Sequence, residues 1–128
     1  MARQGTTPIV TLTIPVERDK DDIIIPSSVL DNCNVYVTID QNGNQITKAS
    51  RTSPDIEITK NYDEDDPTRH ISTSVAMYLS QSETLGFEVG TARVQLRWVN
   101  FIDEAYASDI ATIKIEESLL EEVIEYGN

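Results

Sequence analysis

Hydrophobic and polar residues alternate along two stretches of the chain, residues 8–16 and residues 91–99. A period of two puts successive side chains on opposite faces of an extended backbone, which is the pattern of a half-buried β-strand. In the first run Val10, Leu12 and Ile14 share the predicted inner face. In the second run the predicted inner residues are Ala92, Val94, Leu96 and Trp98. Both runs therefore predict strands of an all-β domain.

The first run is predicted to lie at the edge of a sheet. Pro15 has no amide hydrogen, so a strand that contains it either ends there or leaves one side unpaired. An edge strand presents free N–H and C=O groups with which another chain can pair. We therefore interpret this run as a candidate docking edge.

Turn residues divide the rest of the chain into further short strands. Asn42-Gly43 tolerates the positive φ angles of a type I′ turn, which predicts a hairpin with Ile39 opposite Ile46. The other predicted elements are strands at residues 55–60, 70–79 and 108–115 and a helical turn that Ser80 caps and Gly86 ends.

About seven short strands and almost no helix predict an antiparallel immunoglobulin-like β-sandwich, with a small barrel as the alternative. The predicted organisation is an extended N-terminal arm at residues 1–7, the sandwich at residues 8–115 and a short acidic amphipathic helix or tail at residues 116–128. In the last segment, apolar residues recur at helical spacing at Leu119, Leu120, Val123 and Ile124. A stripe this short is not stable alone, so we expect it to dock on its own sandwich or on a neighbour.

Acidic residues outnumber basic ones in this chain. The 128 residues include 22 Asp and Glu against 10 Lys and Arg, which gives a formal net charge of -12. Repulsion from phosphates and anionic lipids argues against nucleic acid and membrane surfaces as partners. The first residues contain no signal-peptide core, and no run of about 18 apolar residues is present. We therefore expect synthesis in the cytoplasm.

The sequence contains few groups suited to catalysis. His70 is the single histidine, which excludes a histidine pair as metal ligands, and we expect it to be a solvated surface residue. An enzyme would need this residue in a cleft beside an acid and a nucleophile. Cys33 is the single cysteine and is expected to pack as a small apolar residue. The five glycines are dispersed, so no phosphate-binding loop is predicted. We expect neither enzymatic activity nor a cofactor.

Charged side chains form two further candidate sites. The acidic run at residues 63–66 is a candidate for a weak cation site, although such runs are more often solvated loops, and no metal site is predicted. Arg93 and Arg97 form a basic stripe on the outer face of the second alternating run. We expect them either to pair with acidic residues of a neighbouring strand or to meet an acidic patch on another subunit.

Four segments carry a resemblance to a known family. They are residues 4–8 (Gln-Gly-Thr-Thr-Pro) with the strand that follows to Pro15, residues 83–87 (Glu-Thr-Leu-Gly-Phe), Gly90 with residues 94–98 (Val-Gln-Leu-Arg-Trp), and residues 107–110 (Ala-Ser-Asp-Ile). Together they resemble short proteins encoded among the virion genes of tailed bacteriophages and prophages, chiefly of gut bacteria. The chain departs from that pattern in residues 17–22, in residues 63–67 and in its longer acidic C-terminus.

The resemblance implies a non-enzymatic structural role in a virion, with no catalytic residues to carry over. The expected partners are other virion proteins and further copies of this chain. The favoured interpretation is a head decoration or fibre-anchoring subunit. The alternatives are a tail or baseplate adaptor and a receptor- or carbohydrate-binding module on the virion surface. Partner contacts are expected at Gln4, Thr6, Thr7, Pro8, Arg93, Arg97, Leu119, Leu120, Val123 and Ile124.

Overall fold

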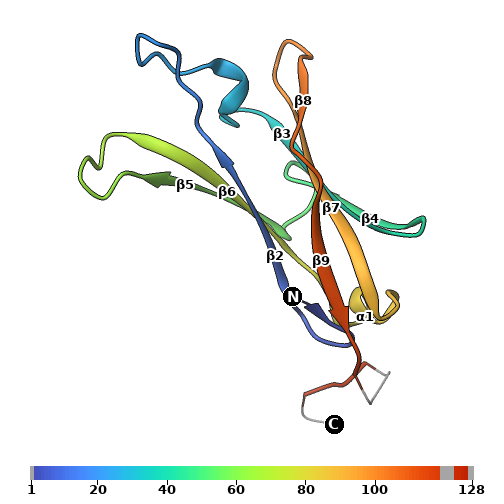
Figure 1. Cartoon of the computed structure of the whole chain (residues 1–128). Helices are drawn as coiled ribbons and strands as arrows, with labels where there is room; N and C mark the ends of the chain where they lie inside the picture. Colours follow the sequence, from blue (N-terminus) through green and yellow to red (C-terminus); the bar gives the residue numbers. More distant parts are fainter. Residues whose placement is uncertain (1, 119–122, 127–128) are drawn as a thin grey trace.

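The computed structural model describes residues 2–118 and 123–126, and β-strands are its main element (Figure 1). The strands form two sheets whose inner faces share one hydrophobic core. The all-β fold expected from the alternating sequence is therefore confirmed.

The larger sheet has the strand order β1-β9-β7-β3-β4, and β8 also pairs with β7. Its strands are β1 (Ala2–Arg3), β3 (Asn34–Gln41), β4 (Asn44–Ala49), β7 (Gly90–Val99), β8 (Ala105–Ala107) and β9 (Ala111–Glu116). The strands pair antiparallel, except that β1 runs parallel to β9.

The smaller sheet is antiparallel and has the order β2-β6-β5. Its strands are β2 (Ile9–Pro15), β5 (Ile56–Tyr62) and β6 (His70–Tyr78). A 3-10 turn (Pro26–Ser28) precedes β3, and the short helix α1 (Gln81–Leu85) connects β6 to β7.

Local sequence signals determine two of these connections. Gln41 pairs with Asn44 and Ile39 with Ile46, while Asn42 and Gly43 have φ angles of 52° and 89°, so the predicted hairpin is confirmed. At the other connection, the Ser80 side chain accepts a hydrogen bond from the Glu83 amide and the Glu83 carboxylate accepts one from the Ser80 amide. This capping box begins α1 at the predicted place.

The end of the chain differs from the single strand predicted at residues 108–115. β8 pairs with the end of β7 and β9 with its beginning, and residues 108–110 interrupt them. The interruption is held by Ser108, whose amide donates to the Leu96 carbonyl at 2.9 Å and whose hydroxyl accepts from the Leu96 amide at 3.0 Å. The Ser108 hydroxyl thus accepts the hydrogen bond that a backbone carbonyl would accept in a regular ladder. The pairing of β8 stops there, and β9 begins at Ala111.

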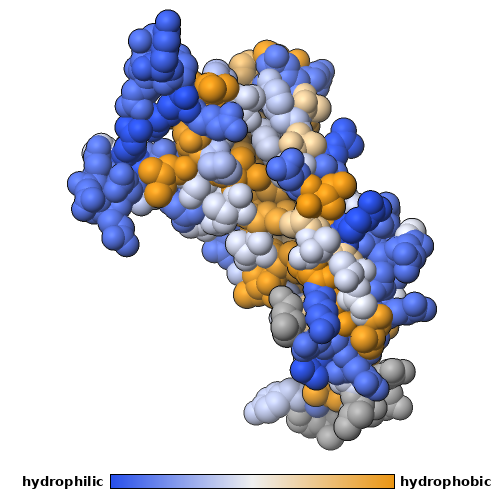
Figure 2. All heavy atoms as spheres, in the orientation of Figure 1, coloured by the Kyte–Doolittle hydropathy of each residue, from blue (hydrophilic) through white to orange (hydrophobic). Residues whose placement is uncertain are grey.

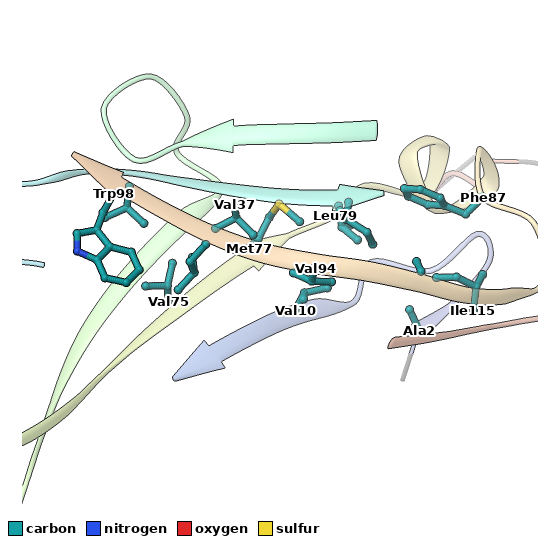
Figure 3. Packing of buried hydrophobic residues seen from close by; sticks show 14 of the residues in the cluster. Ala2, Val10, Val37, Val75, Met77, Leu79, Phe87, Val94, Trp98 and Ile115 are labelled. Carbon is teal, nitrogen blue, oxygen red and sulfur yellow. The ribbon is translucent and has the colours of Figure 1, made fainter. Parts of the chain in front are cut away.

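The core lies between the inner faces of the two sheets (Figure 3). From the larger sheet, every second residue of β7 is buried, as predicted for Ala92, Val94, Leu96 and Trp98. From the smaller sheet, Val75 and Met77 of β6 are at most 1 % exposed and Val10 of β2 is 7 % exposed. Phe87, which follows α1, closes one end.

A polar clamp joins the two sheets at the same end. Lys48 of β4 donates from Nζ to the Asp55 carboxylate at 2.8 Å, to the Tyr78 carbonyl at 2.9 Å and to the Glu83 carboxylate at 2.9 Å. Burial lowers the pKa of Lys48, but the two carboxylates outweigh it and the pKa is raised. Burial likewise raises the pKa of Glu83, but the Lys48 ammonium and the Ser80 amide outweigh it, so this pKa is lowered.

We expect Lys48→Met to reduce the free energy of unfolding at pH 7 by about 1–3 kcal/mol, because it leaves half-buried carboxylates without their cation. Since the folded-state pKa of Glu83 is depressed, this contribution is present at neutral pH and is lost as the pH falls below about 4.5, the ordinary glutamate value. Urea unfolding between pH 7 and pH 3 measures the difference.

The matched control is Lys60→Met, which removes a surface ion pair with Asp31 in which both side chains are more than 40 % exposed. An exposed pair contributes less than about 1 kcal/mol. Equal losses for the two variants, or a Lys48→Met loss that grows in acid, would contradict the clamp.

Candidate functional site: the outer edge of β2

β2 is the edge strand of the smaller sheet. All seven of its residues pair with β6 on one side. On its other side, the described part of the chain places no strand. The edge position inferred from Pro15 is therefore present in the fold (Figure 1).

The register with β6 determines which backbone groups face outward. The Leu79 amide donates to the Pro8 carbonyl at 3.1 Å, and the Val16 amide donates to the Ile71 carbonyl at 2.9 Å. Hydrogen-bonded and non-hydrogen-bonded pairs alternate along an antiparallel ladder, so the even-numbered residues direct their amides and carbonyls to β6. The odd-numbered residues direct theirs outward.

Ile9, Thr11 and Thr13 therefore present N–H and C=O groups at the open edge. Among the described residues, none donates to or accepts from these backbone groups. Pro15 also falls on the outward side, so its missing N–H removes no bond from the sheet. The result is a row of three donor–acceptor pairs that ends at a proline.

β9 lies beside this edge and is itself partly uncovered. β1 pairs with its last residues, Ala2 opposite Ile115 and Arg3 opposite Glu116, and leaves the outer edge of residues 111–113 without a neighbouring strand. An upper cleft of about 480 Å³ lies between β2 and residues 106–111, and a lower cleft of about 170 Å³ lies between β2 and β9. Leu12 and Ala111 line both, so the clefts form one groove along the side of the sandwich.

Apolar residues, threonines and serines line most of the groove, and two carboxylates lie at its upper end. Trp98 and Tyr106 form an aromatic pair at the upper cleft, with ring centroids 6.2 Å apart, and Glu17 and Asp109 also line it. Trp98 is 5 % exposed and donates from Nε1 to the Ser27 carbonyl at 3.2 Å, so its ring belongs to the core wall. In Figure 2 the middle of this face is orange and pale, and hydrophilic residues gather at the loops.

β2 differs in charge from β5 and β4, which are edge strands of the smaller and the larger sheet. Its sequence, Ile-Val-Thr-Leu-Thr-Ile-Pro, contains no ionisable side chain. β5, at the opposite edge of the same sheet, carries Glu57 and Lys60 and has an irregular register at Asn61 and Tyr62. β4, at the edge of the larger sheet, carries Lys48. Charges and bulges are the usual protection of an edge against pairing with another chain, and β2 lacks them.

The structure corrects the expectation of an extended arm at residues 1–7. Ala2 and Gln4 are 3 % and 7 % exposed, and the Gln4 amide donates to the Glu116 carbonyl at 3.1 Å. The chain then turns back at Gly5, whose φ is 73°. The Thr6 carbonyl accepts from the Thr84 hydroxyl at 2.8 Å. The segment is thus held against its own sheet, because its first residues complete the core.

Within this segment the predicted contact residues have different positions. The Gln4 side chain donates from Nε2 to the Phe87 carbonyl, and its Oε1 is buried without a hydrogen-bond partner in the described structure. Thr6 and Thr7 are exposed, and Pro8 is half-buried at the lower cleft. Whether these residues contact a partner stays a prediction.

The two arginines of β7 lie on its outer face as expected. Arg93 donates to the Asp40 carboxylate of β3 at 2.9 Å, which is the intramolecular pairing considered for this stripe. The hydrogen bond from the Arg93 guanidinium holds the pKa of Asp40 below its usual value. Arg97 is exposed and stands opposite Tyr36 of β3.

The C-terminal apolar stripe falls partly outside the described residues, which exclude Leu119 and Leu120. Val123 and Ile124 are 51 % and 60 % exposed, and residues 123–126 are not helical. The Gln81 side chain of α1 holds the Ile124 backbone, donating to its carbonyl at 3.0 Å and accepting from its amide at 2.8 Å. This part of the tail therefore touches its own sandwich through backbone groups.

His70 is less exposed than the solvated surface residue that was expected. The ring is half-buried, with Nε2 at 2.8 Å from the Ser72 carbonyl and 3.1 Å from the Thr73 hydroxyl, and it lies 5.6 Å from the Tyr62 ring. β6 begins at this residue, and the ring folds over its own strand. Cys33 is half-buried against the core, and burial raises the pKa of its thiol.

The acidic run at residues 63–66 forms turns. The Asp63 carboxylate accepts from the Asp65 amide at 3.0 Å, and the Asp66 carboxylate accepts from the Thr68 amide and hydroxyl at 3.0 and 2.6 Å. Within residues 2–118 and 123–126, no group of three or more His, Cys, Asp or Glu residues is arranged to hold a metal ion.

Comparison of the chain with protein-family models, with curated proteins and with solved structures gave no match. In the part of the chain that the structure describes, no helix has the length and apolar character needed to cross a membrane.

For the arginine stripe, we expect Arg93→Ala to lower the urea midpoint slightly at pH 7 and Arg97→Ala to leave it unchanged, since Arg93 has the Asp40 partner. The depressed pKa of Asp40 means that the Arg93 effect disappears as the pH falls below about 3.8, the ordinary aspartate value. Urea titrations of both variants at pH 7 and pH 3 provide the measurement, and a larger loss for Arg97→Ala would refute the assignment.

Proposed function

We propose that this chain is a non-enzymatic structural subunit of a tailed-bacteriophage virion, a head decoration or fibre-anchoring protein that assembles through the outer edge of β2. The assembly role is supported by β2, which is unpaired along one side and carries no charge in a chain of net charge -12. An exposed ladder of backbone groups gives affinity for another strand with a direction fixed by the fold. The virion setting comes from the resemblance of residues 4–15, 83–98 and 107–110 to virion proteins.

The strand order supports the immunoglobulin-like interpretation. Immunoglobulin domains place strands A, B, E and D in one sheet and C, F and G in the other. With β2, β6 and β5 as B, E and D, the strands β3, β7 and β9 follow as C, F and G, and β4 extends the second sheet beside β3. In this comparison, no strand of the described chain occupies the place of A beside β2. The open edge is then at the position that strand A occupies in an immunoglobulin domain.

The upper cleft favours a second candidate, a receptor- or carbohydrate-binding module on the virion surface. Its volume of about 480 Å³ is in the range of small-molecule sites, and Glu17, Asp109 and Ser27 supply polar groups. Sugar sites commonly present exposed aromatic faces, whereas Trp98 is 5 % exposed. The strand edge therefore has the better support.

We expect Thr11→Pro to reduce incorporation of the protein into particles by at least about tenfold, which corresponds to roughly 1.4 kcal/mol. The substitution removes an outward N–H and no bond to β6, so the sandwich is expected to fold. The matched control is Thr11→Val, which alters the side chain and keeps the N–H. Quantitative mass spectrometry of purified particles made with each variant gives the copy number.

Thermal unfolding of the purified variants serves as the folding control. If Thr11→Pro folds and enters particles as well as Thr11→Val, assembly through this edge is refuted. Deletion of residues 2–7 is a poorer test, because it removes Ala2 and Gln4 from the core.

A further inference from the structure

We propose that the outer edge of β2 pairs with the same edge of a second copy of the chain. The two strands run antiparallel with Thr11 opposite Thr11 on a twofold axis, so that the two smaller sheets become one continuous sheet. This inference rests on the proposed function, in which β2 is the docking edge, and it identifies a second copy of the chain as the partner of that edge.

Charge is the first reason for a second copy as the partner. Two copies of a chain with net charge -12 repel each other over most of their surfaces. β2 brings no charged side chain to the contact, and like charges directly opposite each other are therefore absent from a β2–β2 ladder. A β2 edge that paired with the edge of β5 or β4 would instead face Glu57, Lys60 or Lys48.

The outward amides fix the register. With Thr11 opposite Thr11, Ile9 stands opposite Thr13 of the second copy, and every outward N–H and C=O of these three residues has a partner. If one strand is shifted by two residues relative to the other, Ile9 stands opposite Pro15, which has no N–H to donate. A shift in the other direction recruits Thr7, which lies outside β2. Pro15 and the start of the strand thus select one register.

The side chains agree with this register. Ile9 is 55 % exposed on the outer face of the sheet, and pairing places it directly beside Thr13 of the other copy. The two Thr11 side chains meet at the axis, and Thr–Thr pairs are favourable cross-strand neighbours. The pairing therefore covers an exposed apolar residue without burying a charge.

The geometry also limits the assembly to two copies. Each strand uses its free edge on the other, so the contact is isologous and closes on itself. The lower cleft, lined by residues 8–12 and 111–113, leaves this side of the sandwich open to an approaching strand. We expect a dimer that becomes stronger when salt screens the repulsion between the two chains.

Disulfide trapping in the full chain tests the register. In a Cys33→Ser background, Thr11→Cys places two thiols on the axis, where paired Cα atoms are about 5.5 Å apart and within disulfide range. Thr13→Cys is the matched control on the same strand and face, and its two Cα atoms are about 14 Å apart, four residues along the ladder. We expect mild oxidation to give at least about tenfold more covalent dimer for Thr11→Cys than for Thr13→Cys.

Sedimentation equilibrium of the chain without added cysteines provides the second measurement. We expect dimer that increases from low to high salt, and its loss in Thr11→Glu, which places two like charges opposite each other at the axis. Preferential cross-linking of Thr13→Cys would overturn the register. Equal, low cross-linking of both variants together with a monomer at every salt concentration would overturn the pairing of copies. If Thr11→Pro still blocks particle incorporation in that case, the edge docks on a different virion protein and the proposed function stands.

Discussion

The structure depends on the burial of one strand, β7, which is paired along both of its sides. β3 pairs with residues 93–99 on one side, while β9 and β8 pair with residues 90–94 and 97–99 on the other. Its inner side chains, from Ala92 to Trp98, are at most 5 % exposed. A shift of one residue in its pairing would turn this whole set toward solvent. β7 therefore fixes the register of the larger sheet, and the smaller sheet packs against the surface that results.

The same constraint explains why β2 keeps an open edge. β6 contributes Val75 and Met77, which are almost fully buried, to the core that covers β7, and β2 is held in place by pairing with β6 on one side. Val10 is buried, but Leu12 and Ile14, farther along the same face, are half-buried. The cover is thus complete at the end where residues 2–6 fold back and incomplete where β9 gives way to residues 108–110. A strand added at this edge would lie where the core is least protected.

Local rules predicted much of this fold from the sequence. The alternation at β2 and β7, the Asn42-Gly43 turn and the Ser80 cap are each decided within a few residues, and each is found where expected. The features that were missed depend on contacts between distant residues. Ser108 splits the last strand because it bonds to Leu96, and no local signal marks a hydroxyl that takes a backbone role.

The N-terminal segment and the candidate site show the same division. The polar residues around Gln4 predicted a free arm, but pairing with residue 116 and a hydrogen bond to residue 87 bury Gln4 itself. For the site, Pro15 identified the edge position of β2 because proline restricts strand pairing locally. The groove between β2 and β9 could not be predicted, since it exists through the relative position of two strands about one hundred residues apart, and sequence periodicity carries no information about that.

An edge without charges or bulges exposes a protein to uncontrolled association, and other features of this chain limit that danger. β2 has seven residues and stops at Pro15, so a pairing strand cannot extend along it. The chain as a whole has a net charge of -12, which opposes approach in orientations that bring charged faces together. Attraction is short-range and directional at the edge, whereas repulsion is spread over the rest of the surface. In the proposed dimer, this distribution would keep two copies apart until their β2 edges align, and the selectivity would come from the contrast between β2 and its surroundings.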